Sequence, residues 1–207
     1  MEIKRCVFIG VGGQGNLLAS RLLGEAAFSM GIPAVVSEIH GMAQRGGVVE
    51  SAVLVGNVSS PIVSNGEADV LIGFEPLETM RALAKCNKDT LVITNTQPLP
   101  PFTVSIGQGK YPPVDEVLDR IYTKVRKVIA LNGNELAIEA GNPLSLNMVM
   151  LGALIGSGET PVTAEAMTST ISTITRKAFL ESNLKAFHLG LEAARRFTGK
   201  GNTILSL

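Results

Sequence analysis

Near its start, the chain of 207 residues carries a glycine-rich turn between a short apolar run and a helical pattern. In the stretch IGVGGQGNLLASRLL, Gly10, Gly12 and Gly15 have the G-x-G-x-x-G spacing. A strand is predicted before them at residues 4–9 and a helix after them at residues 14–30, which is the context of a dinucleotide-binding turn. There the first glycine makes the turn, the second admits a pyrophosphate, and the third lets the helix pack on the strand. The turn therefore predicts an α/β fold and raises the question of a bound nucleotide.

Strand and helix patterns alternate along the rest of the chain. The apolar runs ADVLIGF, TLVIT and KVIALN read as strands, as does VSIG at residues 104–107, and residues 76–84 and 114–124 have helical patterns. Such alternation predicts a Rossmann-like, three-layer α/β fold with a mostly parallel sheet and a helical C-terminal portion over about residues 144–198. The length is typical of one domain, and we expect a single domain over residues 1–207.

The C-terminal helical portion has two informative patterns. Residues 147–156 are apolar on all sides, which predicts a helix that is deeply buried or packed against a partner. A last helix is expected over residues 176–197, with a stripe of larger apolar side chains. Beside that stripe lies a face of small residues, Ala186, Gly190 and Ala193.

The segment after the second predicted strand departs from a usual dinucleotide-binding unit. Glu38, at the end of the strand PAVVSEI, lies about where an acidic residue would hold a ribose. The loop HGMAQRGG, residues 40–47, then leads straight into another strand at residues 48–56. Eight residues cannot hold the crossover helix that joins parallel strands. We therefore expect the third strand to be antiparallel, or to reach the sheet by another path, and the nucleotide interpretation becomes weaker.

Composition excludes several classes of partner. Lys plus Arg and Asp plus Glu number 18 each, with no basic stripe, so nucleic acid and anionic membranes are not expected partners. The N-terminal apolar run is too short for a signal peptide, and residues 146–155 are too few to span a membrane. We therefore expect a cytoplasmic protein. Charged residues make up only 17% and hydrophobic residues 45%, which indicates either a well-buried core or apolar surface covered by another chain.

The sequence is poor in metal ligands. It contains two cysteines, Cys6 and Cys86, and two histidines, His40 and His188. An iron–sulfur cluster usually takes four thiolates and a structural zinc ion four ligands, so neither is expected on this chain. The same count argues against a Ser-His-Asp or Cys-His catalytic set, and no catalytic residue is identified.

Four blocks in order along the chain resemble a known family. They are GVGGQG, SEIHGMAQRGG, EADVLIGFEPLETMRAL and GNPLSLNMVMLGAL, with ESNLKAFHLG near the end as further support. Together they resemble the gamma-type subunits of 2-oxoacid:ferredoxin oxidoreductases over nearly the whole chain. The form EIHGMAQRGG is most similar to the small (beta) subunits of the indolepyruvate enzymes.

That resemblance implies a subunit without a redox cofactor of its own, which would be inactive alone because it would lack the reacting groups. Thiamine diphosphate and 4Fe–4S clusters would lie on large partner subunits, where a 2-oxoacid is oxidatively decarboxylated. Coenzyme A would capture the acyl group as co-substrate, and ferredoxin would take the electrons through the complex. The alternative that remains open is a stand-alone Rossmann-like protein that binds NAD or FAD.

Candidate residues for contact with a ligand or another subunit fall into three groups. The turn contributes Gly12, Gly13, Gln14 and Gly15, the loop contributes His40, Gln44, Arg45, Gly46 and Gly47, and two acidic residues, Glu38 and Glu75, complete the set. The guanidinium of Arg45 could bind a carboxylate or the phosphates of coenzyme A, but a subunit contact is the favoured role for the loop. The remaining alternative is a loop that hydrogen-bonds its own backbone.

The two acidic residues have structural alternatives. Glu75 follows a predicted strand, at the end where α/β folds place ligand groups. The favoured interpretation is instead a solvated charge that opens the helix at Pro76. Glu38 is expected to be a structural acceptor rather than a ribose ligand, because the crossover helix is missing.

Overall fold

Seven strands form one sheet in the part of the chain that the computed structural model describes, residues 2–40, 47–58, 60–100, 104, 106–107, 109–196 and 203–204. The strands are β1 (Lys4–Val11), β2 (Ala34–His40), β3 (Val48–Val55), β4 (Ala68–Gly73), β5 (Cys86–Asn95), β6 (Lys127–Leu131) and β7 (Thr203–Ile204). Their order across the sheet is β2-β3-β1-β4-β5-β6-β7. Only β3 runs against the others, since it pairs antiparallel with both β1 and β2. The mostly parallel sheet and the antiparallel third strand are thus confirmed.

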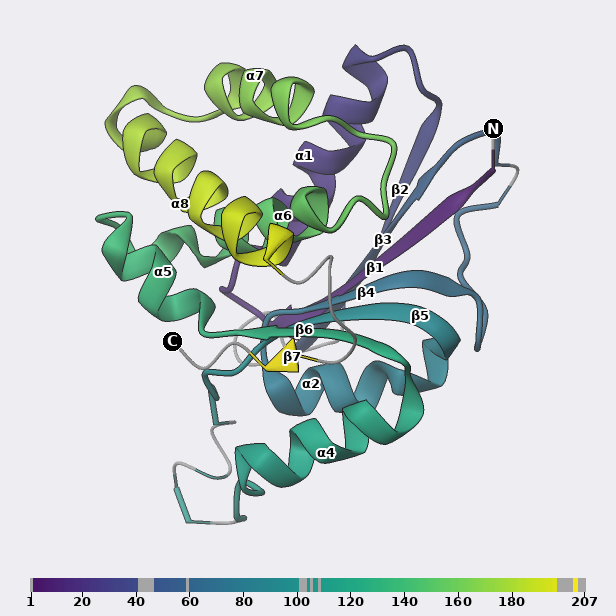
Figure 1. Ribbon diagram of the computed structural model, residues 1–207, viewed down its shortest axis with the longest axis vertical. Coiled ribbons are helices and arrows are strands. Elements are labelled where there is room, and N and C mark those ends of the chain that lie inside the picture. The colour runs from purple at the N-terminus through teal and green to yellow at the C-terminus, as the bar shows by residue number, and fades with distance from the viewer. Residues whose placement is uncertain are drawn as a thin grey trace.

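Helices cover both faces of the sheet and make three layers (Figure 1). They are α1 (Asn16–Ser29), α2 (Pro76–Arg81), α4 (Val114–Lys124), α5 (Gly133–Glu139), α6 (Leu146–Ser157), α7 (Ala164–Ile174) and α8 (Lys177–Arg195), with short 3-10 turns η1 (Ala82–Lys85) and η2 (Pro143–Ser145). One core cluster joins the sheet to α1 and to α5 through α8, and a smaller one joins the other face to α2 and α4. The Rossmann-like three-layer prediction is confirmed.

The C-terminal helices pack against each other with almost no space between their backbones. Every residue of α6 from Leu146 to Gly156 is buried, as the apolar pattern predicted. A Cβ atom added at Gly152 would lie 2.0 Å from the Phe187 carbonyl oxygen, and one at Gly190 would lie 2.0 Å from the Val149 carbonyl oxygen. The small-residue face of α8 therefore serves packing within the chain. Among the described helices, none is long and apolar enough to cross a membrane.

Several element boundaries differ from the sequence predictions. The first helix begins at Asn16, because Gly15 adopts a left-handed conformation (φ 80°) at its N-terminus. Leu18 lies on that helix at the apolar spacing of residues 18, 22 and 26, but it is 40% exposed. The run VSIG is not a strand: its described residues form a turn in which Gly107 N–H bonds the Val104 carbonyl oxygen.

Helix α5 (Gly133–Glu139) is not among the predicted helices. Its signal is a capping arrangement, because the Asn132 side chain accepts a hydrogen bond from Glu135 N–H three residues later. Helix α7 also begins with a side-chain cap, a threonine that is recognisable from the sequence: the Thr163 hydroxyl accepts a hydrogen bond from Ala166 N–H. The last helix is slightly shorter than predicted and spans Lys177–Arg195.

We expect the substitution Gly190→Ala to destabilise the protein by about 1–3 kcal/mol, because the added methyl group would overlap the backbone of α6. The direction of this change distinguishes a close contact from an open site, because Gly→Ala at an open helix position increases the free energy of unfolding by about 1 kcal/mol. Urea unfolding followed by circular dichroism measures the change. Glu192→Ala, at an exposed position of the same helix, is the matched control and should stay within about 0.5 kcal/mol. Equal stability of the two variants would contradict the close contact.

Candidate functional site

The candidate site lies at the carboxyl ends of β1 and β4. The chain leaves β1 into α1 on one face of the sheet and leaves β4 into α2 on the other face (Figure 1). The divergence of the two connections makes this a topological switch point, where open α/β sheets commonly bind ligands. The predicted glycine turn and Glu75 both lie there.

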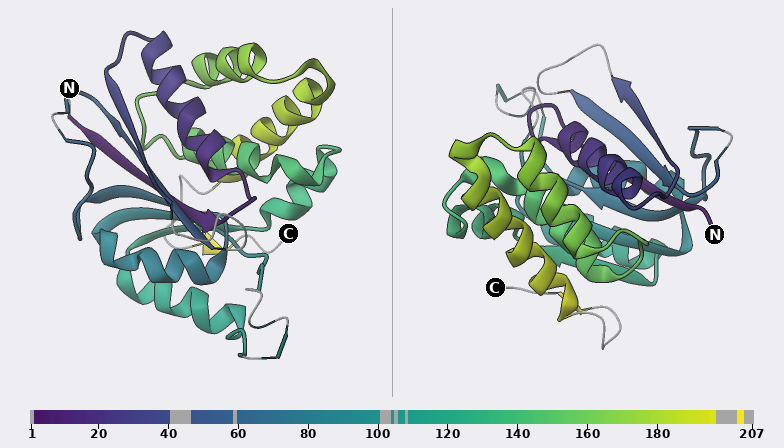
Figure 2. Two further views of the ribbon diagram at one scale, coloured as in Figure 1. Left: turned by 180° about the vertical axis from the view of Figure 1, so that it is seen from behind. Right: turned by 90° about the horizontal axis from the view of Figure 1, so that it is seen from above.

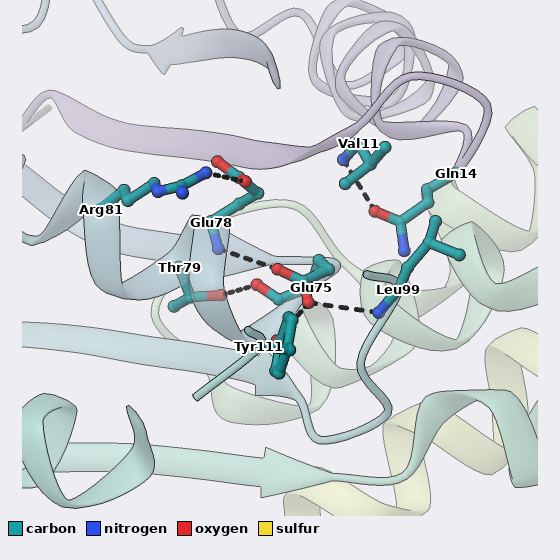
Figure 3. Close-up of polar contacts among 8 residues, drawn as sticks. All are labelled: Val11, Gln14, Glu75, Glu78, Thr79, Arg81, Leu99 and Tyr111. Carbon is teal, nitrogen blue, oxygen red and sulfur yellow. Dashed lines mark hydrogen bonds and ion pairs between the residues drawn. The ribbon is translucent and has the colours of Figure 1, made fainter. Parts of the chain in front are cut away.

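The glycine turn is tied to the end of β4 by the side chain of Gln14. Its Oε1 accepts a hydrogen bond from Val11 N–H at 2.8 Å, and its Nε2 donates to the Phe74 carbonyl oxygen at 2.9 Å. Figure 3 shows the contact between Val11 and Gln14. A Cβ at Gly10 would lie 2.9 Å from Phe74 Cβ, so the first glycine permits the close approach of these strands. The turn keeps its geometry, and both ends of the Gln14 amide hold it in place.

Groups of the protein itself surround the second and third glycines. Gly12 N–H donates to the Gly47 carbonyl oxygen at 2.9 Å. A Cβ at Gly15 would lie only 2.7 Å from Asn147 Nδ2, which comes from α6. In a dinucleotide site the second glycine faces the pyrophosphate. A carbonyl oxygen already bound to that glycine is an unfavourable neighbour for phosphate, so this geometry does not favour the NAD or FAD alternative.

Glu38 is displaced from the turn by a whole strand. Because β3 lies between β2 and β1, Glu38 pairs with Ser51, and Ser51 in turn pairs with Phe8 of β1. Neighbouring strands are about 4.8 Å apart, so Glu38 is about 5 Å farther from β1 than an adjacent strand would place it. This is consistent with the expectation that Glu38 is not a ribose ligand.

The polar loop is described only at its ends. His40 closes β2, where its backbone pairs with Val49, and Gly47 contacts Gly12 as above. Gln44, Arg45 and Gly46 lie outside the described residues. Gly13, in the turn, has a left-handed φ of 106°, which favours glycine.

Glu75 is buried, not solvated, which corrects the favoured interpretation from the sequence: its side chain is 1% exposed. Its position at the start of α2 is as predicted, and its Oε2 accepts from Glu78 N–H at 2.9 Å. Its Oε1 accepts from Leu99 N–H at 3.2 Å and from the Tyr111 hydroxyl (Figure 3). One carboxylate thus holds the helix start and two points of the loop after β5. All of these partners belong to the chain itself.

Sequence reasoning missed Asn95, the polar centre of this end of the sheet. Its buried Nδ2 donates to the Phe74 carbonyl oxygen at 3.0 Å and to Asn134 Oδ1 at 2.9 Å, and its Oδ1 accepts from Gly133 N–H at 3.0 Å. The available signal was an amide residue that directly follows the apolar strand run TLVIT. Asn95 and Gln14 share the Phe74 carbonyl, so one acceptor joins β1, β4, β5 and α5.

A hollow of about 140 Å³ opens beside this network. Gln14, Gln97 and Asn134 contribute amides to its wall, and Leu99 and Leu144 contribute apolar side chains that are 45% and 82% exposed. The residues that line it carry no formal charge. It suits a small uncharged group, such as one side chain, and is far smaller than a dinucleotide pocket of several hundred Å³.

The cysteines do not suit an iron–sulfur cluster. Cys6 and Cys86 are both buried, and burial raises the pKa of each thiol to about 12. A cluster needs thiolates, usually four of them. No group of three or more His, Cys, Asp or Glu side chains in the described ranges is arranged to hold a metal ion.

Glu78 is the carboxylate with the least favourable surroundings. It is 3% exposed, its Oε1 accepts from Arg81 Nη1 at 2.5 Å, and its Oε2 has no hydrogen-bond partner in the described part of the chain. Burial raises the pKa of Glu78 above the ordinary value of 4.5, Arg81 opposes the rise, and Glu75 adds to it.

This environment predicts a pH-dependent effect of Glu78→Gln. Because the folded-state pKa of Glu78 is raised, the folded protein holds a proton more tightly than the unfolded chain, and stability falls as pH rises from about 4.5 through the raised value. The variant lacks this loss, so its free energy of unfolding should improve relative to that of the wild type as the pH rises from 4 to 8. Urea unfolding at pH 4 and pH 8 measures the difference in the free energy of unfolding between variant and wild type. Glu181→Gln, at an exposed position, is the control. A difference that does not change with pH would contradict the prediction.

Comparison with known proteins places this geometry in a family. Residues 5–193 match the model of the pyruvate ferredoxin/flavodoxin oxidoreductase family. The chain is 43% identical to a protein named indolepyruvate oxidoreductase subunit IorB from Methanothermobacter thermautotrophicus, over 89% of this chain and 94% of that protein. It is 40% identical to the protein of the same name from Archaeoglobus fulgidus, over 91% and 94%. Relatives named for pyruvate/ketoisovalerate or 2-oxoglutarate enzymes are 28–31% identical.

A solved structure agrees with these matches. The gamma subunit of a keto/oxoacid ferredoxin oxidoreductase from Geobacter sulfurreducens superimposes with a TM-score of 0.69 at 26% identity, over 93% of this chain and 99% of that one. The resemblance inferred from the four sequence blocks is therefore confirmed. The chain belongs to the pyruvate ferredoxin/flavodoxin oxidoreductase family.

Proposed function

We propose that this chain is the small, gamma-type subunit of an indolepyruvate-class 2-oxoacid:ferredoxin oxidoreductase. The observation that carries the proposal is 43% identity to a protein named as such a subunit, over nearly the full length of both chains. The lower identity to relatives named for pyruvate or 2-oxoglutarate enzymes supports the arylpyruvate class. The geometry agrees, since the glycine turn is filled by the protein's own groups.

The reacting groups are proposed to lie on other chains. Thiamine diphosphate and 4Fe–4S clusters would belong to a large partner subunit, coenzyme A would enter as co-substrate, and ferredoxin would accept electrons through the complex. The two buried thiols of this chain, with pKa values near 12, support the assignment of the clusters to the partner. The assembly is proposed to work in the cytoplasm, with residues 1–207 acting as one domain.

The role proposed for this end of the fold is to present a rigid surface. Gly12, Gly13, Gln14 and Gly15 are proposed to hold strand, helix and neighbouring loop in one arrangement, and Gly47 supports them through its carbonyl oxygen. His40, Gln44, Arg45 and Gly46 are proposed to contact the partner subunit or coenzyme A from the loop between β2 and β3. Glu38 and Glu75 are proposed to act structurally.

Reconstitution tests the proposed function. The purified chain is expected to be colourless and inactive, and co-expression with the large subunit from the same organism should give coenzyme A-dependent oxidation of indolepyruvate coupled to ferredoxin reduction. Parallel assays with pyruvate and 2-oxoglutarate test the substrate class. Failure of the two chains to form a stable complex would overturn the proposal.

The nucleotide alternative has its own test. Gly12 N–H already donates a hydrogen bond to the Gly47 carbonyl oxygen, and β3 separates the strand that carries Glu38 from β1. The isolated chain should therefore show no saturable binding of NAD(H), NADP(H) or FAD up to about 100 μM in calorimetric titration. Micromolar affinity for any of them would instead favour a stand-alone nucleotide-binding protein.

A further inference from the structure

Helix α1 carries a stripe of four exposed side chains on the outside of the molecule. They are Leu18, Arg21, Glu25 and Phe28, and every other residue of the helix between Asn16 and Phe28 is buried or half-buried. Phe28 is 77% exposed and Leu18 is 40% exposed. Figure 2 shows α1 at the outside of the fold, flanked by β2 and α7. The α1 stripe is therefore accessible to another molecule.

The spacing within the α1 stripe is that of a seam between two helices. Steps of three, four and three residues separate positions 18, 21, 25 and 28, as they separate the a and d positions of a heptad repeat. At 3.6 residues per turn, such positions lie along one narrow side of the helix. Side chains on this side interdigitate with those of a facing helix in a coiled-coil contact. The spacing therefore favours a helix as the facing element.

The order of the four side chains is self-complementary when two copies of α1 run antiparallel. With a two-fold axis at the level of residue 23, position 18 of one copy faces position 28 of the other, and position 21 faces position 25. Leu18 then packs on Phe28 of the second copy, and Arg21 lies opposite Glu25 of the second copy. The symmetry repeats both contacts, so a second copy of the same helix satisfies all four positions.

The charges also select the direction of the two helices. In a parallel pair, Arg21 would face Arg21 and Glu25 would face Glu25 across the axis. Such contacts between like charges are unfavourable, and they are a common means of excluding an alternative arrangement. Charge complementarity therefore favours the antiparallel pair.

The ion pair between Arg21 and Glu25 within the helix leaves room for a better contact between copies. Arg21 Nε lies 3.9 Å from Glu25 Oε1, and both side chains are exposed to solvent. An acidic residue that precedes a basic one by four positions stabilises a helix more than this reverse order does. The guanidinium group is a planar fork of donors that binds a carboxylate best through two parallel hydrogen bonds. The second copy can supply that carboxylate.

A hollow beside the α1 stripe gives space for the apolar end of the second helix. Its volume is about 520 Å³, and Phe28 of α1 lines it together with Ala34 and Val36 of β2. In the antiparallel pair, Leu18 of the second copy lies at this end of α1. Glu38 also lines the hollow, but it takes part in another interaction, and the pairing does not involve it.

We propose that two copies of this chain associate through α1, antiparallel about a two-fold axis, with Leu18 packed on Phe28 and Arg21 paired with Glu25. The inference goes beyond the proposed function and requires no other subunit. Four side chains per copy are fewer than the roughly 20–30 residues a side of a standard interface, so we expect a weak dimer of the free chain, with a Kd of about 10–100 μM.

Charge reversal tests the pairing. Glu25→Arg places arginines opposite arginines, and Arg21→Glu places carboxylates opposite carboxylates, so each variant alone should dimerise at least about tenfold more weakly than wild type. An equimolar mixture of the two variants should regain the wild-type affinity, because the arginines of one chain then face the carboxylates of the other. The double variant Arg21→Glu/Glu25→Arg should dimerise by itself. Sedimentation velocity over a concentration series measures each Kd.

A matched control separates the pairing from the effect of net charge. Glu181→Arg makes the same change of charge at an exposed position of α8 and should leave the Kd within about twofold of wild type. Circular dichroism checks that every variant is folded. A wild type that stays monomeric up to about 1 mM would overturn the inference. A mixture of the two single variants that dimerises no better than either variant alone would overturn it as well.

The large partner subunit is the competing occupant of the α1 stripe. If the free wild type is monomeric and Glu25→Arg weakens its binding to the large subunit, the stripe belongs to that subunit, and the inference fails while the proposed function stands. If the free chain dimerises through α1 but forms no complex with the large subunit, only the proposed function fails.

Discussion

The structure depends on the antiparallel pairing of β3 with the whole length of β1. Eight consecutive pairs join Lys4↔Val55 through Val11↔Val48. This pairing brings the Gly47 carbonyl to Gly12 N–H at the mouth of the glycine turn, and it pushes β2 to the margin of the sheet. The same strand insertion therefore alters the phosphate position of a dinucleotide fold and places β2 at the margin of the sheet. The glycine turn therefore has the spacing of a cofactor site, but Gly12 N–H is bonded to a carbonyl oxygen of the protein itself.

The second organising feature is the Phe74 carbonyl at the end of β4. Gln14 and Asn95 both donate to it, and Asn95 continues to Asn134 and Gly133. Buried amide networks whose donors and acceptors are paired favour one arrangement of the surrounding loops, because an unpaired group would cost about 1–3 kcal/mol. The buried carboxylate of Glu75 fixes the next loop in the same way, because it accepts hydrogen bonds from Leu99 N–H and the Tyr111 hydroxyl. These polar side chains are thus engaged in hydrogen bonds within the chain, which stabilise the fold.

The predictable part of the structure is the part determined by local pattern. Strand-forming runs, the cap at Thr163 and the missing crossover helix after Glu38 could be inferred because each depends on neighbouring residues. The burial of Glu75 could not, since it depends on donors 24 and 36 residues away in sequence, at Leu99 and Tyr111. Helix α5 has a local signal in the sequence, the cap formed by Asn132 and Glu135. The contact of Asn147 with Gly15 of the glycine turn has none, because the two residues are 132 positions apart in the chain. Long-range polar contacts of this kind leave no periodic trace in a single sequence.

The distribution of exposed apolar side chains explains how a subunit with few ionisable groups at its candidate site can still contribute to an enzyme. Leu99 and Leu144 line an uncharged hollow at the carboxyl end of the sheet, and Phe28 and Val36 line another hollow between α1 and β2. Leu18 of α1, which is 40% exposed, belongs to the same exposed set. Apolar surface of this extent is stabilised when another chain removes it from water. Exposed apolar surface is then a feature that the described part of this chain can offer to an assembly.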